Sequence, residues 1–152
     1  GECAEPEAAT PAMGSRPAGD ELSRDPTLRM WLARCCVMCD KAQQAWEIYL
    51  KIEGTQDSFA MLQLLANDCY RAGAFLVAAK AFEALERLDP SPEYWEGKRG
   101  ACVGVFQQIV GGQQRKEDVR EVLGLLKATR NPQGEYLTRV MKKWGRDKNV
   151  NL

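Results

Sequence analysis

The chain has 152 residues, in which 21 Lys and Arg balance 21 Asp and Glu, and it contains no His. The absence of His excludes Ser-His-Asp or Cys-His catalytic sites and His-containing zinc sites, and the balanced charge argues against attraction of the whole chain to nucleic acid or anionic lipid. With 45% hydrophobic and 28% charged residues, the composition predicts one globular domain, and no segment approaches the roughly 18 apolar residues of a membrane span.

Residues 1–24 differ in composition from the rest of the chain. They are rich in Ala, Pro and Gly, and only Met13 and Leu22 are large apolar residues. Such a segment cannot bury enough apolar surface to offset the entropy lost on ordering, so we predict a disordered or flexible acidic segment. A short acidic recognition motif within it remains open. The folded domain is expected over residues 25–152.

From Asp25 onward, the apolar residues recur at helical spacing. A capping residue followed by proline, which is typical of helix starts, occurs at positions 25–26, 91–92 and 131–132. The first helix carries an apolar stripe that we expect to face the core, formed by Leu28, Trp31, Leu32 and Cys35. Trp46 and Trp95 are expected in the core as well. Further helices are predicted over about 42–53, 58–72 (with Ser58 as its cap), 76–88, 93–110, 116–129 and 131–144, with no convincing strand.

These helices form an internal repeat. A shift of 33 residues superposes residues of like size, namely Cys36 and Cys69, Ala33 and Ala66, Ala45 and Ala78, Tyr49 and Phe82, and Ile52 and Leu85. Small residues let two antiparallel helices approach closely, the aromatic residue fills the groove against the next pair, and a proline ends the second helix. The pattern is similar to the tetratricopeptide repeat, whose period is about 34 residues. We therefore predict an all-α, right-handed TPR-like α-solenoid with two clear helical hairpins, a divergent third and a C-terminal capping helix.

Several stretches resemble a particular family. Residues 92–104 (PEYWEGKRGACVG) are the most specific, and residues 31–35, 62–64, 66–70, 79–82, 85–90 and 141–144 add to them. On these residues, the region from about 28 to 152 resembles the C-terminal part of the intraflagellar transport protein fifty-six family, whereas residues 1–24 do not. The resemblance implies a non-enzymatic subunit of intraflagellar transport complex B, found in the cilium or flagellum, at the ciliary base and in the cytoplasm. It also implies binding to other complex B subunits, notably subunit forty-six, and transport of axonemal, motility-related cargo.

The spacing of the cysteines is compatible with a metal or redox centre. Cys36 and Cys39 have the C-x-x-C spacing, beside Cys35. A four-thiolate site would also need Cys69 and Cys102, but the repeat places these one and two hairpins away. Stacked helices lie about 10 Å apart, far more than the Zn–S bond of about 2.3 Å allows. We therefore expect no metal and no cofactor, and mostly buried, reduced cytosolic thiols, with no secretory signal at the start of the chain. Surface redox sensitivity remains open.

Three glycines and several carboxylates have simple structural interpretations. Gly97, Gly100 and Gly104 follow no strand and precede no Gly-Lys-Ser/Thr sequence, so they do not form a phosphate-binding loop. We expect them to let a neighbouring helix approach closely. Carboxylates such as Glu83 and Glu86 are expected on a solvated helix face, not as a general acid/base pair.

The last part of the chain is basic. Residues 115–152 carry ten Lys and Arg against five Asp and Glu, whereas residues 25–114 carry nine against eleven. Cations alternating with apolar residues near the end predict a cationic amphipathic helix, which is either a solvated cap or a contact for an acidic protein, nucleic acid or lipid. We expect neither nucleic-acid binding nor membrane insertion. The predicted partner-binding residues are Tyr94, Lys98, Arg99, Arg139, Lys142, Lys143 and Trp144; no catalytic residue or metal ligand is predicted.

The sequence leaves two other functions open. A stand-alone, co-chaperone-like TPR adaptor would bind a peptide carboxylate with convergent Lys and Asn side chains in a concave groove. In this sequence, Asn67 is the one residue at a position that suits this role. A thiol-based redox enzyme would use Cys36 and Cys39, and burial of both sulfurs would exclude it.

Overall fold

The computed structural model describes residues 25–129 and 131–150, and within them every regular element is an α-helix. The all-α prediction is therefore confirmed. The helices are α3 (Pro26–Met38), α4 (Ala42–Ile52), α5 (Ser58–Ala72), α6 (Phe75–Leu88), α7 (Pro92–Val110), α8 (Asp118–Lys127) and α9 (Pro132–Asp147). The expectation for residues 1–24 lies outside the described residues. In the described part of the chain, no helix has the length and apolar character needed to cross a membrane.

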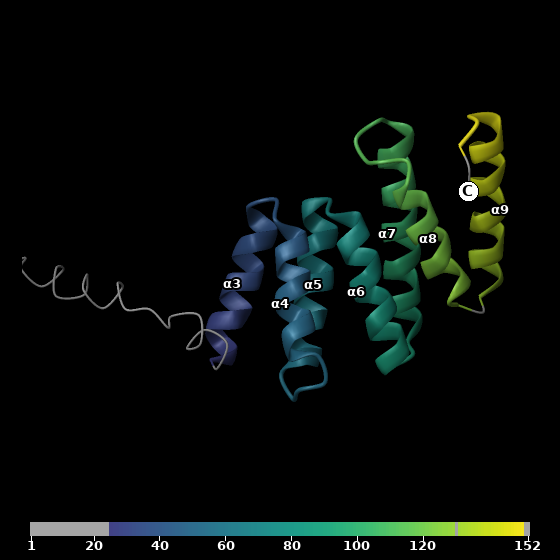
Figure 1. Cartoon of the computed structure of the whole chain (residues 1–152). Coiled ribbons are helices and arrows are strands. Elements are labelled where there is room, and N and C mark those ends of the chain that lie inside the picture. Colours follow the sequence, from purple (N-terminus) through teal and green to yellow (C-terminus); the bar gives the residue numbers. More distant parts are fainter. Residues whose placement is uncertain (1–24, 130, 151–152) are drawn as a thin grey trace, which may run out of the picture.

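The helices pair into three antiparallel hairpins that stack side by side and end in α9, as a TPR-like solenoid does (Figure 1). Each hairpin packs on the next, with α3 against α5, α4 against α6 and α6 against α8. The tight turn between α5 and α6 passes through Gly73 at φ +80°, a left-handed conformation that glycine adopts without steric cost.

Three of the predicted helix starts are confirmed. The side chains of Asp25, Ser91 and Asn131 accept hydrogen bonds from backbone N–H groups of the first turn, and proline follows each of them. The prediction for Ser58 is wrong, because Ser58 is the first residue inside α5 and its Oγ donates to the Thr55 carbonyl at 2.8 Å.

The 33-residue repeat accounts for the core. The small residues Ala33, Ala45, Ala66 and Ala78 are all buried, as are the paired aromatic and aliphatic positions Tyr49, Phe82, Ile52 and Leu85. Because the small side chains lie where helices meet, each hairpin closes tightly and leaves its aromatic residue to fill the space between hairpins.

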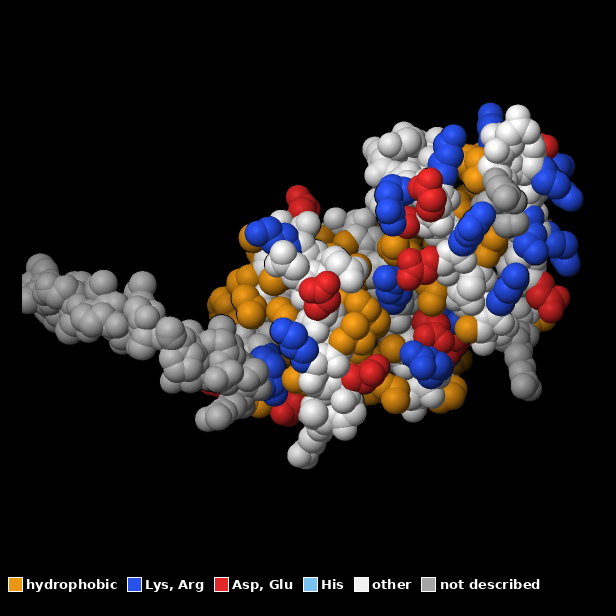
Figure 2. Space-filling view, viewed as in Figure 1, with side chains coloured by type: hydrophobic (Ala, Val, Ile, Leu, Met, Phe, Trp, Pro, Cys, Tyr) orange, Lys and Arg blue, Asp and Glu red, His pale blue; other side chains and the backbone are white. Residues whose placement is uncertain are grey.

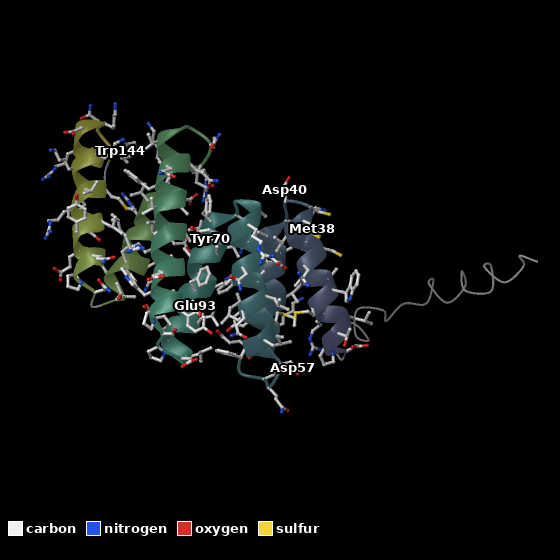
Figure 3. The ribbon with its side chains drawn as sticks, turned by 180° about the vertical axis from the view of Figure 1, so that it is seen from behind. Met38, Asp40, Asp57, Tyr70, Glu93 and Trp144 are labelled. Atoms are coloured by element: carbon white, nitrogen blue, oxygen red, sulfur yellow. The ribbon has the colours of Figure 1, made fainter. Side chains whose placement is uncertain are left out.

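The interface between α6 and α7 is the most extensive contact between any two helices of the described residues. A Cβ atom at Gly97, Gly100 or Gly104 would lie 2.6 Å from Phe82, Tyr70 or Phe75, respectively. The glycine prediction is therefore confirmed: the three glycines make room for three aromatic rings, and Tyr70 lies against α7 in the view from behind (Figure 3). The Tyr70 ring meets those of Phe75 and Phe82 edge to face.

The predicted core stripe of α3 is wrong. Trp31 is 67% exposed, and Leu28, Leu32 and Cys35 are exposed as well. The buried residues of α3 are Ala33 and Val37, on the opposite side of the helix. The physical reason is that α3 is the outermost helix of the described array, so only the side that meets α4 and α5 has neighbours. Of the other two tryptophans expected in the core, Trp95 is buried and Trp46 is half-buried.

Candidate partner-binding surfaces

The terminal helix α9 is fixed in orientation by its inner face. Met141 is buried and Leu137 packs beside it. The Trp144 ring meets the Phe106 ring of α7 edge to face, with centroids 5.2 Å apart. A Cβ at Gly134 would lie 3.1 Å from the Leu126 carbonyl oxygen of α8. Because α9 packs against both α7 and α8, the same side chains of α9 always face outward.

That outward face is basic. Arg139, Lys142, Lys143 and Arg146 recur at i, i+3, i+4 and i+7 and are all exposed; we call them the cationic face. Blue side chains gather along α9 at the right edge of the space-filling view (Figure 2). None of the four forms an ion pair with a carboxylate of the described residues. Like charges at these spacings repel one another, so an acidic partner would relieve repulsion.

Lys98 is a correction to the predicted partner-binding residues. Its side chain is fully buried, and its Nζ lies 2.7 Å from Oε1 of Glu86 and 5.6 Å from the centroid of the Trp95 ring. The ion pair joins α7 to α6, and the indole adds a cation–π contact. Lys98 therefore has no exposed atom to offer a partner.

Tyr94 and Arg99 connect α7 to other helices. The Gln63 amide of α5 donates a hydrogen bond to the Tyr94 hydroxyl at 3.0 Å. The Arg99 guanidinium donates to the Gln133 side-chain oxygen of α9 at 2.6 Å. Both residues are half-buried, so part of each side chain is accessible.

The seven predicted residues are thus not all available to a partner, because Lys98 is buried. Arg139, Lys142 and Lys143 lie together, and Trp144 anchors the helix behind them. Arg146 belongs to the predicted cationic amphipathic helix but was omitted from the seven predicted binding residues, to which the i+7 spacing from Arg139 could have added it. The sequence prediction also omitted the exposed apolar residues next to the cations, Tyr136 and Val140. A basic surface with apolar side chains beside it is suited to a protein partner, because protein interfaces combine apolar contact with charge complementarity.

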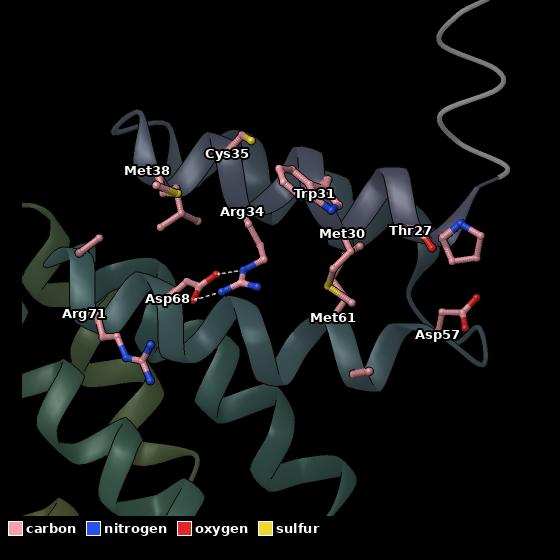
Figure 4. Close-up of a pocket in the computed structure, with 14 residues that line it drawn as sticks. Thr27, Met30, Trp31, Arg34, Cys35, Met38, Asp57, Met61, Asp68 and Arg71 are labelled. Carbon is pink, nitrogen blue, oxygen red and sulfur yellow. Dashed lines mark hydrogen bonds and ion pairs between the residues drawn. The ribbon is translucent and has the colours of Figure 1, made fainter.

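A groove between α3 and α5 was not predicted from the sequence. It has a volume of about 720 Å³, and its lining includes Met30, Trp31, Met38 and Met61 (Figure 4). The Arg34 Nε lies 2.8 Å from Oδ2 of Asp68 and bridges the two helices. The hydrogen bond and the charge of Asp68 raise the pKa of Arg34. The 33-residue shift, which places α3 beside α5, was the signal that could have located this groove.

The thiols fall into two groups. Burial raises the pKa of Cys69 from 9.0 to about 12, helped by the nearby Asp68 charge, and burial raises that of Cys102 to about 12 against the opposing charge of Lys98. Cys35 and Cys39 are exposed and Cys36 is half-buried, so among the five described cysteines the prediction of buried thiols holds for Cys69 and Cys102. Since Cys39 is exposed, burial does not exclude the redox interpretation of the C-x-x-C pair. Among the described residues, no three metal-ligating side chains converge.

Asn67, the candidate residue of the adaptor interpretation, is partly engaged within its own helix. The Asn67 amide donates to the Gln63 carbonyl of its own helix at 3.0 Å, which engages one donor of that amide. The Arg34 guanidinium of the groove is already paired with Asp68.

Comparison with known proteins decides the family. The family model described as intraflagellar transport protein 56 matches residues 18–152. The intraflagellar transport protein 56 homolog of Caenorhabditis elegans is 39% identical over 124 residues. The chain belongs to the intraflagellar transport protein 56 family. The matched region is 80% of this chain and 22% of the worm protein.

Membership of the intraflagellar transport protein 56 family confirms the resemblance predicted for residues 28–152. The match begins at residue 18, which corrects the expectation that none of residues 1–24 belongs to it. Residues 92–104 lie in α7, the helix that carries the three glycines and the buried Lys98. The most specific sequence run of the chain therefore coincides with its most extensive helix interface.

Proposed function

We propose that this chain is part of a non-enzymatic scaffold subunit of intraflagellar transport complex B, required for cilium assembly and motility. It binds other complex B subunits, notably subunit forty-six, and assists transport of axonemal, motility-related cargo. The protein acts in the cilium or flagellum, at the ciliary base and in the cytoplasm. The observation that carries the proposal is the family match across residues 18–152, on a solenoid that leaves a charged outer face on its terminal helix.

The surroundings of the titratable groups support a scaffold role. Glu83 pairs with Arg87 at 3.0 Å and Glu86 with Lys98 at 2.7 Å, so these carboxylates serve structural ion pairs. The buried thiols of Cys69 and Cys102 have raised pKa values and are therefore poor nucleophiles. A catalytic site instead brings a nucleophile and a base into hydrogen-bond reach.

We propose the cationic face of α9 as the docking surface for an acidic segment of a complex B partner. Tyr136 and Val140 provide apolar contact beside the charges. Tyr94, Arg99 and Trp144 are half-buried, so part of each side chain is accessible, and we include them in the proposed contact area. Lys98 is excluded because it is buried.

Affinity capture from ciliated cells tests both parts of the proposal. The bait is the tagged chain, and its charge-reversed variant carries Arg139→Glu, Lys142→Glu and Lys143→Glu. Recovery of complex B subunits should fall by about tenfold or more in this variant, because attraction to an acidic partner becomes repulsion. Raised salt should weaken recovery by the unmodified chain, since exposed charges are screened.

A control variant with Lys41→Glu, Lys51→Glu and Lys116→Glu makes the same change in net charge at other exposed positions and should retain recovery. Circular dichroism verifies that both variants keep their helix content. If the unmodified chain recovers no complex B subunit, membership of that complex is refuted. If the chain and the α9 variant recover the subunits equally well, only the assignment of the cationic face is refuted.

A further inference from the structure

The groove between α3 and α5 is open at positions that are bridged in the next interface of the array. Met30 and Met61 line this groove. The 33-residue shift places them on Gln63 and Tyr94, and the Gln63 amide of α5 donates a hydrogen bond to the Tyr94 hydroxyl of α7 at 3.0 Å. Polar side chains therefore close the second interface at this point, whereas the first keeps a cavity of about 720 Å³.

A third position of the groove differs in the same way. Val37, which also lines it, corresponds to Tyr70 after the 33-residue shift. The Tyr70 ring fills the space above Gly100 of α7, where an added Cβ would lie 2.6 Å from the hydroxyl oxygen. The smaller side chain of Val37 cannot reach across to α5 as the Tyr70 ring reaches α7. The groove is thus a specific feature of the α3–α5 interface and not a general property of the repeat.

The groove has two apolar patches with an ion pair between them (Figure 4). One patch contains Met30, Trp31 and Met61, and the other contains Val37, Met38 and Ala72. Arg34 and Asp68, which join the two helices between these patches, are paired at 2.8 Å. On α3, corresponding residues of the two patches are seven positions apart, which is about 10.5 Å along a helix.

The lining is suited to an apolar protein segment. Three of the five methionines of the chain, Met30, Met38 and Met61, line this groove. Methionine is flexible and polarizable, and it is frequent on surfaces that adapt to bound helices. Trp31 is 67% exposed and Met38 is 83% exposed. Tryptophan at the edge of a cavity is a typical energetic anchor of protein interfaces.

The groove favours a helix over an extended peptide. The helices α3 and α5 use their backbone hydrogen bonds internally, and both carboxylate oxygens of Asp68 accept from Arg34. An extended peptide would bury backbone N–H and C=O groups for which the apolar patches offer no partner, and such burial is unfavourable. A helix satisfies its own backbone, and its residues i and i+7 lie about 10.5 Å apart on one face, as the two patches do.

Unpaired charges mark the two ends of the groove. Asp57 precedes α5 and Arg71 lies in its last turn, and they lie at opposite ends of the groove in Figure 4. Both are exposed, and neither forms an ion pair within the described part of the chain. A helix is stabilised by acidic residues near its N-terminus and basic residues near its C-terminus. Charge complementarity therefore directs the N-terminus of a bound helix toward Arg71 and its C-terminus toward Asp57.

We propose that the α3–α5 groove is a binding site for an amphipathic helix of a partner protein, which runs antiparallel to α3 and α5. The helix has large apolar residues at i and i+7, acidic residues in its first turn and basic residues in its last turn. Asp57 and Arg71 are 14 positions apart, so the helix spans about four turns, or about 21 Å. This site is separate from the cationic face of α9 and does not depend on the proposed ciliary role.

Two designed peptides test the site and its direction. Each is an Ala-rich, fluorescein-labelled helix of about 16 residues with leucines at i and i+7. The forward peptide has Glu in its first turn and Lys in its last turn, and the reversed peptide has the same composition with these charges exchanged. In fluorescence anisotropy titrations with the full chain, the forward peptide should bind about fivefold more tightly or better, because its charges attract Arg71 and Asp57.

Variants of the chain locate the contact. The double variant Asp57→Lys, Arg71→Glu keeps the net charge and should reverse the preference, so that the reversed peptide binds more tightly. Trp31→Glu should weaken binding of the forward peptide by about tenfold or more. The control Leu50→Glu changes an exposed apolar residue of α4 outside the groove and should leave the affinity unchanged. Circular dichroism verifies that each variant keeps its helix content.

Several results would overturn the proposal. Failure of both peptides to bind, or equal binding to the Trp31→Glu variant, would show that the groove is not the site. A preference that the double variant does not reverse would refute the direction, and undiminished binding of a forward peptide with a central proline would refute a helical occupant. Tighter binding after deletion of residues 1–24 would identify the chain itself as the occupant. A dimer that Trp31→Glu dissociates would identify a second copy.

Discussion

Helices α3 and α7 show that apolar spacing alone does not decide which side of a helix is buried. In α3, a stripe of large apolar residues at helical spacing is exposed. In α7, a helix interrupted by three glycines makes the most extensive contact of the described residues. Apolar periodicity alone would rank these two helices in the opposite order.

The difference shows that packing depends on the neighbour as much as on the helix itself. Aromatic rings from α5 and α6 fill the space above the glycines of α7, so small and large side chains are complementary across that interface. The stripe of α3 has no such complement among the described residues. A stripe therefore indicates which residues can be buried, and the arrangement of the repeat decides which ones are.

The largest difference between α3 and α7 should appear when a tryptophan is truncated in each. Trp95 of α7 is buried, so Trp95→Ala should lower the free energy of unfolding by about 3–5 kcal/mol. Trp31 of α3 is 67% exposed, so Trp31→Ala should change it by no more than about 0.5 kcal/mol. Urea unfolding followed by circular dichroism at low protein concentration measures both values. Equal losses would show that Trp31 is packed in solution and would contradict the difference in burial between α3 and α7.

A second prediction concerns the fit of glycines to aromatic rings. In Gly97→Ala, the new Cβ would lie 2.6 Å from the Phe82 ring, which is itself buried. Overpacking of about 1–3 kcal/mol should outweigh the helix-propensity gain of up to about 1 kcal/mol. Gly124 of α8 has no atom within 4 Å of the Cβ position, so Gly124→Ala should stabilise the chain.

The same urea titrations decide this prediction, and the pair Gly97→Ala with Phe82→Leu locates the cause. If the clash with the Phe82 ring is responsible, the double variant should lose less stability than the sum of the two single changes. Additive losses would assign the effect of Gly97→Ala to some other contact.

Sequence reasoning was most successful where local chemistry determines the structure. Caps at Asp25, Ser91 and Asn131 depend only on the residues next to them, and the 33-residue repeat located the small residues between helices.

Sequence reasoning failed where the neighbouring helix decides whether a side chain is buried, as for Trp31 and Lys98. Lysine is rarely buried, and burial of Lys98 is possible because Glu86 approaches from α6 while Trp95 lies one turn earlier on α7 itself. Of the candidate site, the spacing of Arg139, Lys142 and Lys143 could be predicted, whereas the anchoring role of Trp144 required knowledge of Phe106.

The smallest expected effect concerns the buried thiols and appears only at alkaline pH. Burial favours the neutral thiols of Cys69 and Cys102 and raises their pKa values from 9.0 to about 12 in the folded chain. Their contribution to stability is therefore complete below pH 9 and is lost as the pH rises from 9 toward 12, because the unfolded state then releases protons that the folded state retains. The free energy of unfolding, measured across this range, should fall more steeply for the unmodified chain than for the double variant Cys69→Ala, Cys102→Ala. Burial also raises the pKa of Tyr49, so the double variant should keep a reduced slope instead of none. Identical slopes would mean that both thiols ionise freely, which the packing of α5 and α7 against their neighbours does not allow.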